Sequence, residues 1–438
     1  MSSLLAARLQ MAVSLGFHIL FAVAGMAMPL LMLLAEWRYL RTGRAEYRSL
    51  SERWAKGTAI LFAVGAVSGT VLSFELGLLW PRFMLHAGPL IGMPFSLEGF
   101  AFFLEAIALG VYLYGRERVP AAVHFASGAV VALSGVASGV FVVAVNAWMN
   151  TPRGFRLLPG GDFTDIDLVR AFFTPAFASQ AAHMVCAAYS SIAFAVLGIH
   201  AFRLLRQPSS ELHAAALRVV LPLAIVTAPL QAFTGDAAGK QLAVYQPVKL
   251  AAAEALFETA RPAPLVLGGL PDMDARRVRF GIEIPGALSI AAFGDPHAEV
   301  RGLNAFPRED WPPVPLVHLA FQAMVGCGTA LLGIAAWGAW LLLSKRQLAA
   351  QKRFLRACAL VGPLGLAAVE AGWIVTEVGR QPWIIQGVMH TRDAVTPMPN
   401  LVVSFVASVV VYAFLGGVVA LLLTRYVLGE EPPAETHA

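Results

Sequence analysis

Charged residues are scarce in this sequence of 438 residues: Asp, Glu, Lys and Arg make up 13% of it, whereas apolar residues make up 58%. Soluble globular domains contain about 25% charged residues, so the charges here are too few to cover a water-exposed surface. Intrinsic disorder is excluded as well, because disordered chains are poor in apolar residues. The apolar runs are continuous rather than alternating, which favours an all-α polytopic membrane protein over a β-barrel.

Cysteines and clusters of basic residues are also few. The three cysteines, Cys186, Cys327 and Cys358, lie far apart inside apolar runs and show no CxxC spacing. This pattern indicates neither a disulfide framework nor a zinc site. The net charge is +5, but Lys and Arg form no dense cluster, so we expect no nucleic-acid partner.

Nine apolar runs approach or exceed the roughly 20 residues that a helix needs to cross a bilayer. The predicted spans cover 9–35, 57–78, 96–114, 121–146, 179–202, 217–235, 313–343, 355–376 and 401–424. We therefore expect six membrane helices within residues 1–235, an external loop over 236–312, and three membrane helices with a cytoplasmic tail over 313–438.

Lys and Arg are distributed unequally between the two ends of the predicted spans. One side carries 17 of them, and the other carries seven outside the long loop. Loops rich in Lys and Arg usually remain in the cytoplasm. The N-terminus and the long loop are therefore predicted to lie outside the membrane, and the C-terminus inside.

Ionisable residues inside apolar spans are functional candidates, because a charge in the hydrocarbon layer costs at least a few kcal/mol unless it is paired, ligated or hydrated. With the predicted orientation, the outer half of the membrane contains His18, Glu98, His183, Met324 and Glu377. His18, for example, lies about 15 Å along its helix at 1.5 Å per residue. Random placement would scatter such side chains through both halves, so their clustering indicates one shared site.

Haem ligation is the chemistry that suits these side chains. A His/Met pair gives a six-coordinate, low-spin, electron-transferring iron, and His183 with Met324 could provide it from different helices. His18 and Glu377 could each hold a five-coordinate iron with an open face for oxygen. Taken singly, each residue also has a simpler interpretation: a lone His often packs through hydrogen bonds, and a Met often fills a core. His124 has no obvious partner, so its role stays undecided.

Two carboxylates of the third span are aligned for a different task. Glu98 and Glu105 are seven residues apart, so they project from one face of a helix about 10 Å apart along its axis. Such a pair suits a proton relay through an apolar layer. An ion-coupled secondary transporter or proton channel, with Glu98, Glu105 and Glu370 as relay groups, is the alternative interpretation.

Several short motifs are carried by these same segments. They are Ser96-Leu97-Glu98-Gly99-Phe100, Phe102-Phe103-Leu104-Glu105, Asn146-Ala147-Trp148-Met149, Lys249-Leu250-Ala251-Ala252-Ala253-Glu254-Ala255, Met324-Val325-Gly326, Glu370-Ala371-Gly372-Trp373 with Glu377, and Gly379-Arg380-Gln381-Pro382-Trp383. With these motifs, the chain resembles subunit I of the cytochrome bd quinol oxidases over nearly its whole length.

The resemblance implies three haems: two haem b and one haem d, or haem b in place of haem d. His183 and Met324 match the ligands of a low-spin haem b near the quinol site. His18 and Glu377 match the axial ligands of the two high-spin haems, and which of them holds haem d stays open. A non-catalytic paralogue of the oxidase subunit is a further alternative, and the retained ligand residues argue against it.

The resemblance also implies roles for residues around the haems. Glu98 and Glu105 match an acidic pair beside the di-haem centre. Lys249 and Glu254 match residues of the quinol-oxidising loop. Trp373 matches an aromatic residue between the haems, and Arg380 matches a basic residue near the haem propionates.

The chain departs from the family pattern at two places. Gln322, two residues before Met324, stands where well-studied members carry Arg, so a charge near the low-spin haem is missing. The quinol loop is short, as in the cyanide-insensitive branch.

The implied function is a terminal oxidase of the bacterial cytoplasmic (inner) membrane. It oxidises quinol at the outer face and reduces O2 to water, with charge separation across the bilayer. The implied partners are a second membrane subunit, oxidase subunit II, and a very small third subunit.

Overall fold

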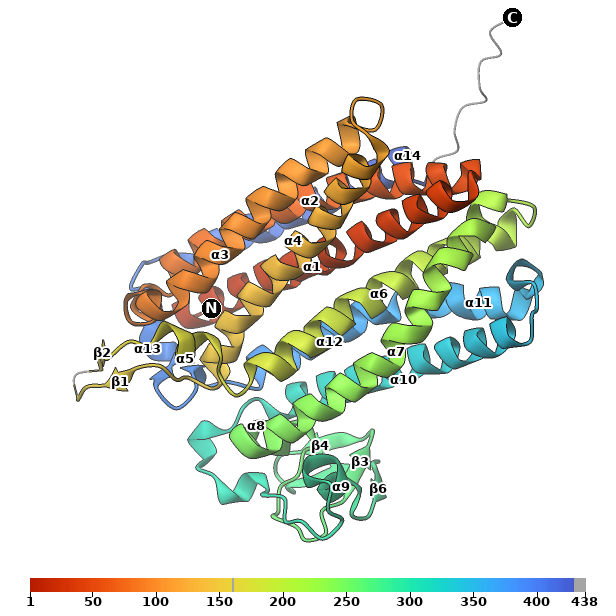
Figure 1. Cartoon of the computed structure of the whole chain (residues 1–438). Coiled ribbons are helices and arrows are strands. Elements are labelled where there is room, and N and C mark those ends of the chain that lie inside the picture. Colours follow the sequence, from red (N-terminus) through yellow and green to blue (C-terminus); the bar gives the residue numbers. More distant parts are fainter. Residues whose placement is uncertain (160, 429–438) are drawn as a thin grey trace, which may run out of the picture. The chain divides into compact units, whose positions relative to one another are not determined.

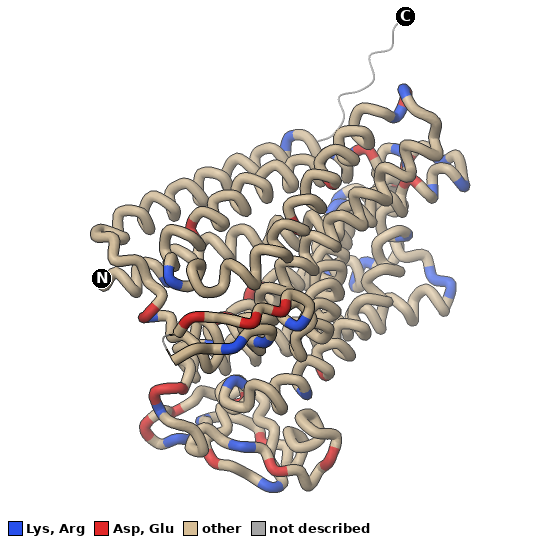
Figure 2. Tube along the Cα trace, turned by 60° about the vertical axis from the view of Figure 1, so that its left-hand side comes forward, with Lys and Arg blue, Asp and Glu red and all other residues tan. Residues whose placement is uncertain are grey.

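A computed structural model of the chain describes residues 1–159 and 161–428. Among these residues, nine helices are long and apolar enough to cross a membrane, which confirms the nine predicted spans and the all-α polytopic class. They are α1 (Ser3–Thr42), α2 (Ala45–Leu79), α3 (Pro81–Tyr114), α4 (Ala121–Asn150), α6 (Phe177–Arg206), α7 (Glu211–Tyr245), α10 (Val314–Leu343), the segment Lys352–Val378, and α14 (Leu401–Tyr426). Charged residues lie mostly at helix ends and in the connections, with long uncharged stretches between them (Figure 2).

The sixth membrane helix is longer than its apolar run. The predicted span ends at residue 235, but α7 continues to Tyr245, so the first ten residues assigned to the external loop are helical. Asp236 and Lys240 stabilise these added turns through an ion pair of 2.6 Å between positions i and i+4. A helix can therefore continue past the point where its apolar pattern stops.

The eighth predicted span is interrupted. It consists of α11 (Lys352–Val361) and α12 (Leu364–Val378), because Pro363 has no backbone N–H with which to continue the helix. The break lies against α6, where a Cβ atom on Gly198 would come within 2.9 Å of the Gly362 Cα. Such close approach of two backbones is typical of small residues between membrane helices.

The chain divides into two compact units, and the first is formed by Met1–Leu76, Ala101–Val136 and the described part of Pro397–Ala438. In this unit α1 packs along α14. An apolar cluster of Phe21, Val64 and Val419 joins α1, α2 and α14.

The second unit comprises Gly77–Phe100 and Ala137–Thr396. Its centre is a group of four helices, α6, α7, α10 and α12, which run side by side (Figure 1). The connection between α7 and α10 gathers at one end of these two helices (Figure 1).

That connection is only partly regular. It contains α8 (Pro247–Ala253), β3 (Leu265–Leu267), β4 (Leu270–Asp272), β5 (Arg277–Arg279), β6 (Ile282–Ile284), α9 (Ala287–Phe293), and the short helices η1 (Leu303–Ala305) and η2 (Arg308–Asp310). Strands β3 and β6 pair antiparallel, as do β4 and β5. Residues of α8 pack on Val314 and Val317 at the start of α10, which fixes this part of the loop to a membrane helix.

The remaining elements are short. They are β1 (Arg156–Leu157), β2 (Phe163–Thr164), α5 (Leu168–Phe172), η3 (Leu348–Ala350), β7 (Trp383–Ile385), β8 (Met389–His390) and α13 (Thr391–Ala394).

Large apolar side chains are exposed along the membrane helices. Phe100, Ile107, Leu133 and Phe414 each expose more than half of their surface. An exposed apolar surface of this kind needs lipid or another membrane subunit to cover it.

Candidate cofactor and substrate site

His18, a predicted ligand, lies on α1 in the first unit. Its Nδ1 is 3.0 Å from the Ser68 hydroxyl, which itself donates to the Val64 carbonyl at 2.9 Å. The hydroxyl therefore accepts a hydrogen bond from Nδ1–H, and Nε2 keeps the lone pair that a metal ligand needs. The next residue of α2 is Gly69, where a Cβ atom would lie 2.9 Å from the His18 ring. Glycine is needed there because a larger residue would displace the imidazole.

His183, the second predicted histidine ligand, lies on α6 in the second unit. Its Nδ1 is 3.3 Å from the Thr234 hydroxyl, and the Gln231 amide nitrogen is 3.2 Å from its Nε2. Thr234 is followed by Gly235, where a Cβ atom would lie 3.3 Å from the His183 ring. These contacts with the His183 imidazole therefore all come from helix α7.

Met324 lies on α10, in the same four-helix group as His183. A Cβ atom on Gly372 of α12 would lie 3.1 Å from the Met324 sulfur, so the glycine leaves the thioether the space it occupies. Trp373 follows directly and is half-buried. The structure thus places His183 and Met324 on helices of the same group, and the single site shared by all five residues stays a prediction.

Glu377 lies near the end of α12, and both of its carboxylate oxygens are engaged. Asn146 of α4 donates to Oε1, and Arg380 donates to Oε2 through Nη2 at 2.5 Å. Arg380 is only 3% exposed, yet its Nε and Nη1 atoms have no hydrogen-bond partner among the described residues. A buried guanidinium with two unfilled donors fits an acidic group such as a haem propionate.

Lys249 of α8 belongs to the same buried network. Its ammonium donates to the Asn150 side-chain oxygen at 2.5 Å and to the Thr376 carbonyl at 3.1 Å. Asn150 donates in turn to the side-chain oxygen of Asn146 at 2.9 Å. Two asparagines of α4 therefore link Lys249 with the carboxylate of Glu377.

The charge state of Lys249 follows from its surroundings. Burial, together with the neighbouring Arg380 guanidinium, lowers the pKa of Lys249 to about 7, against a smaller opposite effect of Glu377. The Lys249 ammonium can therefore release a proton near neutral pH, and the neutral amine can take one up.

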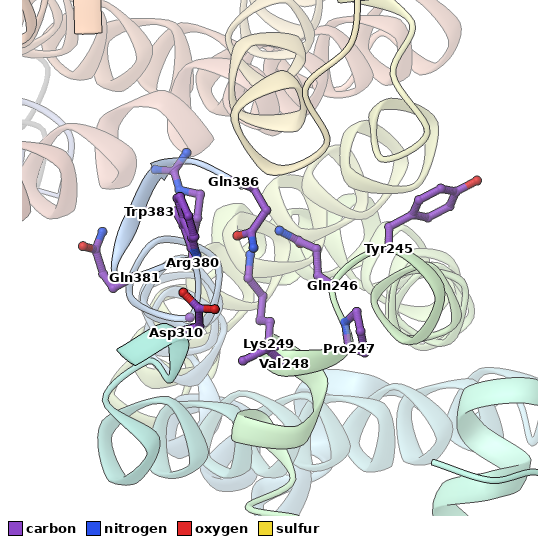
Figure 3. Close-up of a pocket in the computed structure, with 11 residues that line it drawn as sticks. Tyr245, Gln246, Pro247, Val248, Lys249, Asp310, Arg380, Gln381, Trp383 and Gln386 are labelled. Carbon is purple, nitrogen blue, oxygen red and sulfur yellow. The ribbon is translucent and has the colours of Figure 1, made fainter. Parts of the chain in front are cut away.

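A small polar cavity opens beside Lys249 (Figure 3). It measures about 50 Å³, room for a few water molecules. Its lining includes Tyr245, Gln246, Asp310, Arg380 and Trp383. The cavity thus brings the predicted quinol-loop lysine and the predicted propionate-binding arginine to one space.

Glu254 ends α8 and does not line this cavity. The side chain is 4% exposed, and its Oε2 atom has no hydrogen-bond partner within the part of the chain that the structure describes. Burial raises the pKa of Glu254 to about 7. Lys249 within α8 therefore lines the cavity, whereas Glu254, the residue directly after α8, does not.

The two aligned carboxylates of α3 have separate surroundings. Glu98 accepts a hydrogen bond from the Ser138 hydroxyl at 3.2 Å and is half-buried. Glu105 is 4% exposed, and a Cβ atom on Gly135 would lie 3.3 Å from its Oε1. Both carboxyl groups are thus held within a membrane helix, where they can store a proton.

Sequence reasoning missed the polar partners of these side chains. Asn146 and Asn150 repeat at a spacing of four in an otherwise apolar span, a signal that could have singled them out. Gln231 and Thr234 form a similar pair on α7.

His124, whose role stayed undecided, is part of a buried hydrogen-bonded group in the first unit. Its Nδ1 lies 2.6 Å from Glu36 and its Nε2 lies 2.8 Å from the Tyr112 carbonyl. Both ring nitrogens of His124 therefore face oxygen acceptors, whereas Nε2 of His183 faces the Gln231 amide nitrogen.

The donor set fits a macrocycle better than a bare ion. Within residues 1–159 and 161–428, no group of three or more His, Cys, Asp or Glu side chains comes together to hold a metal. Haem supplies four nitrogen ligands itself and needs only axial donors from the protein, which single His, Met or Glu side chains can provide.

Comparison with known proteins agrees with this chemistry. A family model described as cytochrome bd terminal oxidase subunit I matches residues 6–431. The chain belongs to this family. Cytochromes carry haem, so membership of the cytochrome bd family implies haem cofactors for this chain, and the designation subunit I implies a partner subunit.

Individual relatives match almost end to end. A putative cytochrome bd menaquinol oxidase subunit I of Bacillus subtilis (strain 168) is 38% identical over 97% of both chains. The cytochrome bd-II ubiquinol oxidase subunit 1 of Escherichia coli (strain K12) is 28% identical over 88% of both. The bd oxidase structure from Geobacillus thermodenitrificans superposes with a TM-score of 0.91 at 39% identity, covering 97% of this chain and 98% of that one.

Proposed function

We propose that this chain is the haem-binding subunit I of a quinol oxidase that oxidises quinol at the outer membrane face and reduces O2 to water. The observation that carries the proposal is the buried network from Lys249 to Glu377 and Arg380, in a chain that matches the cytochrome bd family over residues 6–431. An ion-coupled transporter would not require this buried network, and we would not expect a transporter to have oxidase subunits as its relatives.

We assign the ligands as follows: His183 and Met324 hold a low-spin haem b, and His18 and Glu377 hold two high-spin haems. One of the latter is haem d, or haem b in its place. When bound, these haems supply electron transfer and oxygen reduction. The contact of His18 Nδ1 with Ser68 and the glycines beside all three neutral donors support the assignment. Arg380 supplies positive charge for a propionate.

Lys249 and Glu254 bind quinol and accept its protons. Their pKa values of about 7 match the working pH, which is the condition under which a general acid or base is most effective. Asn150 fixes the Lys249 ammonium at the cavity. Because this loop is predicted to lie outside, the released protons reach the outer side.

Glu98 and Glu105 hold protons on their way to the oxygen site from the cytoplasm. Release of protons outside and uptake from inside separate charge across the bilayer without a dedicated pump. Trp373, next to the glycine that borders Met324, is the aromatic residue between the haems.

The protein works with a second membrane subunit, oxidase subunit II, and a very small third subunit, in the bacterial cytoplasmic membrane. The exposed apolar side chains of its membrane helices support such partners.

The test is oxygen consumption by the purified complex with a soluble quinol, together with reduced-minus-oxidised spectra. We expect quinol-dependent oxygen uptake and b-type bands. The substitution Glu105→Gln should slow uptake by about a hundredfold, the usual scale for losing a positioned proton carrier, with unchanged haem content. Quinol-independent solute flux, or oxygen uptake that Glu105→Gln leaves unchanged, would contradict the proposal.

A further inference from the structure

Gln322 stands on α10 two residues before Met324, and its side-chain amide is bound at both ends. Its Oε1 accepts the Gly268 N–H at 2.9 Å, and its Nε2 donates to the Val266 carbonyl at 2.9 Å. Val266 and Gly268 flank Leu267, and this carbonyl and N–H point to the same edge of β3. The opposite edge of β3 pairs with β6. The amide of Gln322 therefore takes the place of a neighbouring strand.

His318 lies one turn earlier on the same face of α10 and is fully buried. Its Nδ1 is 2.9 Å from the Ala253 carbonyl, and its Nε2 is 3.4 Å from the Gly268 carbonyl. Ala253 is the last residue of α8 and directly precedes Glu254. His318 and Gln322 together thus join the end of α8 and the turn after β3 to one membrane helix.

The turn itself depends on this attachment. Gly268 and Gly269 both adopt positive φ angles, 67° and 91°, so the chain reverses sharply right after the segment that Gln322 holds. An arginine at position 322 could not replace the glutamine, because a guanidinium has donors but no acceptor for the Gly268 N–H.

We propose that Gln322 and His318 are positioning residues for quinol oxidation: they fix the loop that carries Glu254 to the helix that carries Met324. This inference rests on the proposed function, in which Glu254 accepts a proton from quinol. Position 322 then carries no charge and serves instead to hold the loop, which requires the donor and the acceptor of an amide side chain.

The test compares Gln322→Met, which removes both hydrogen bonds at similar volume, with Gln347→Met, the same change at an exposed glutamine. In the complete oxidase, Gln322→Met should raise the quinol KM about tenfold and leave kcat and the haem spectrum nearly unchanged. Gln322→Glu retains the acceptor for Gly268 and should have a smaller effect. Equal KM values for Gln322→Met and Gln347→Met would overturn the proposal.

Hydrogen exchange measured at residue resolution separates this inference from the proposed function. The Gly268 amide should be protected in the unmodified oxidase and should exchange at least tenfold faster in Gln322→Met, whereas Glu254→Gln should leave its exchange unchanged. An unprotected Gly268 amide in the unmodified protein overturns the inference, even if the variant fails to assemble. Normal turnover in Glu254→Gln would instead contradict the proposed function.

Discussion

The two units of the chain hold their predicted histidine ligands in the same way. In the first unit, the ring of His18 meets Ser68 and Gly69, and in the second unit the ring of His183 meets Thr234 and Gly235. In both units, a side-chain hydroxyl contacts Nδ1 of the histidine, and the glycine that follows the hydroxyl residue leaves room for the imidazole ring. The hydroxyl residue and the glycine after it are the part that the two histidine supports share, and in the second unit Gln231 contacts the His183 ring in addition.

The units differ in what surrounds that common arrangement. In the second unit, Lys249, Glu377 and Arg380 form one hydrogen-bonded network through two asparagines. Around His18 in the first unit, the described contacts of the ring are with neutral groups. Under the proposed assignment, the His18 ligand therefore has neutral, local contacts, whereas the Glu377 ligand shares a network of buried charges with the proposed quinol-site residue Lys249.

The largest expected effect comes from removing either histidine. His183→Ala should abolish the low-spin haem b signal and quinol oxidation while the polypeptide still inserts into the membrane. His18→Ala should remove a high-spin haem and retain the low-spin signal. Difference spectra with haem extraction measure both. If the low-spin spectrum survived in His183→Ala, the ligand assignment would be wrong.

Arg380→Leu tests the charged network of the second unit. Removing one partner of a buried ion pair costs about 3–5 kcal/mol, because it leaves the Glu377 carboxylate without its counter-charge. We expect loss of the haem that Glu377 holds, with the haem at His18 retained. If the variant lost both haems to the same extent, the charged network would not be specific to the haem site of the second unit.

The pH dependence of turnover tests Glu254. Burial raises its pKa to about 7, so the carboxylate that accepts a proton is present above about pH 7 and is lost as the pH falls below it. Oxygen uptake should therefore fall on acidification in the unmodified enzyme. Glu254→Gln should be slower by about a hundredfold and show a shallower fall near pH 7, because only Lys249 then titrates there. An unchanged pH profile in the variant would exclude Glu254 as the titrating group.

The smallest effects are expected from Gly69→Ala and Gly235→Ala. The added Cβ atoms would approach the two histidine rings to 2.9 Å and 3.3 Å, so the first substitution should be the more harmful. Overpacking of this kind typically costs about 1–3 kcal/mol. Haem content and thermal unfolding of both variants can be compared directly. A larger effect at Gly235 would show that the two supports are not equivalent.

The sequence was sufficient to predict the fold class, whereas the haem-ligand positions stay predictions. Nine apolar runs correspond to nine long apolar helices among the described residues, because a bilayer requires every spanning segment to be long and apolar. The break at Pro363 was not predicted, although proline is the residue that most often interrupts a helix. Helix ends were also misjudged, since ion pairs such as Asp236–Lys240 extend a helix beyond its apolar run.

The partners of the site residues could not be predicted, because they come from distant parts of the chain. Lys249 and Asn150 are separated by 99 positions, and His124 and Glu36 by 88. Gln322 illustrates the same limit. The sequence showed only that a charge was missing there, whereas the structure shows two hydrogen bonds to the loop.

Pyridine haemochrome analysis of the purified protein gives the most direct test of whether side chains on separate helices bind iron porphyrins. We expect haem b in every preparation, with its amount reduced in His183→Ala. A colourless protein, or a haem b content that none of the ligand substitutions changes, would contradict the assignment of His18, His183, Met324 and Glu377.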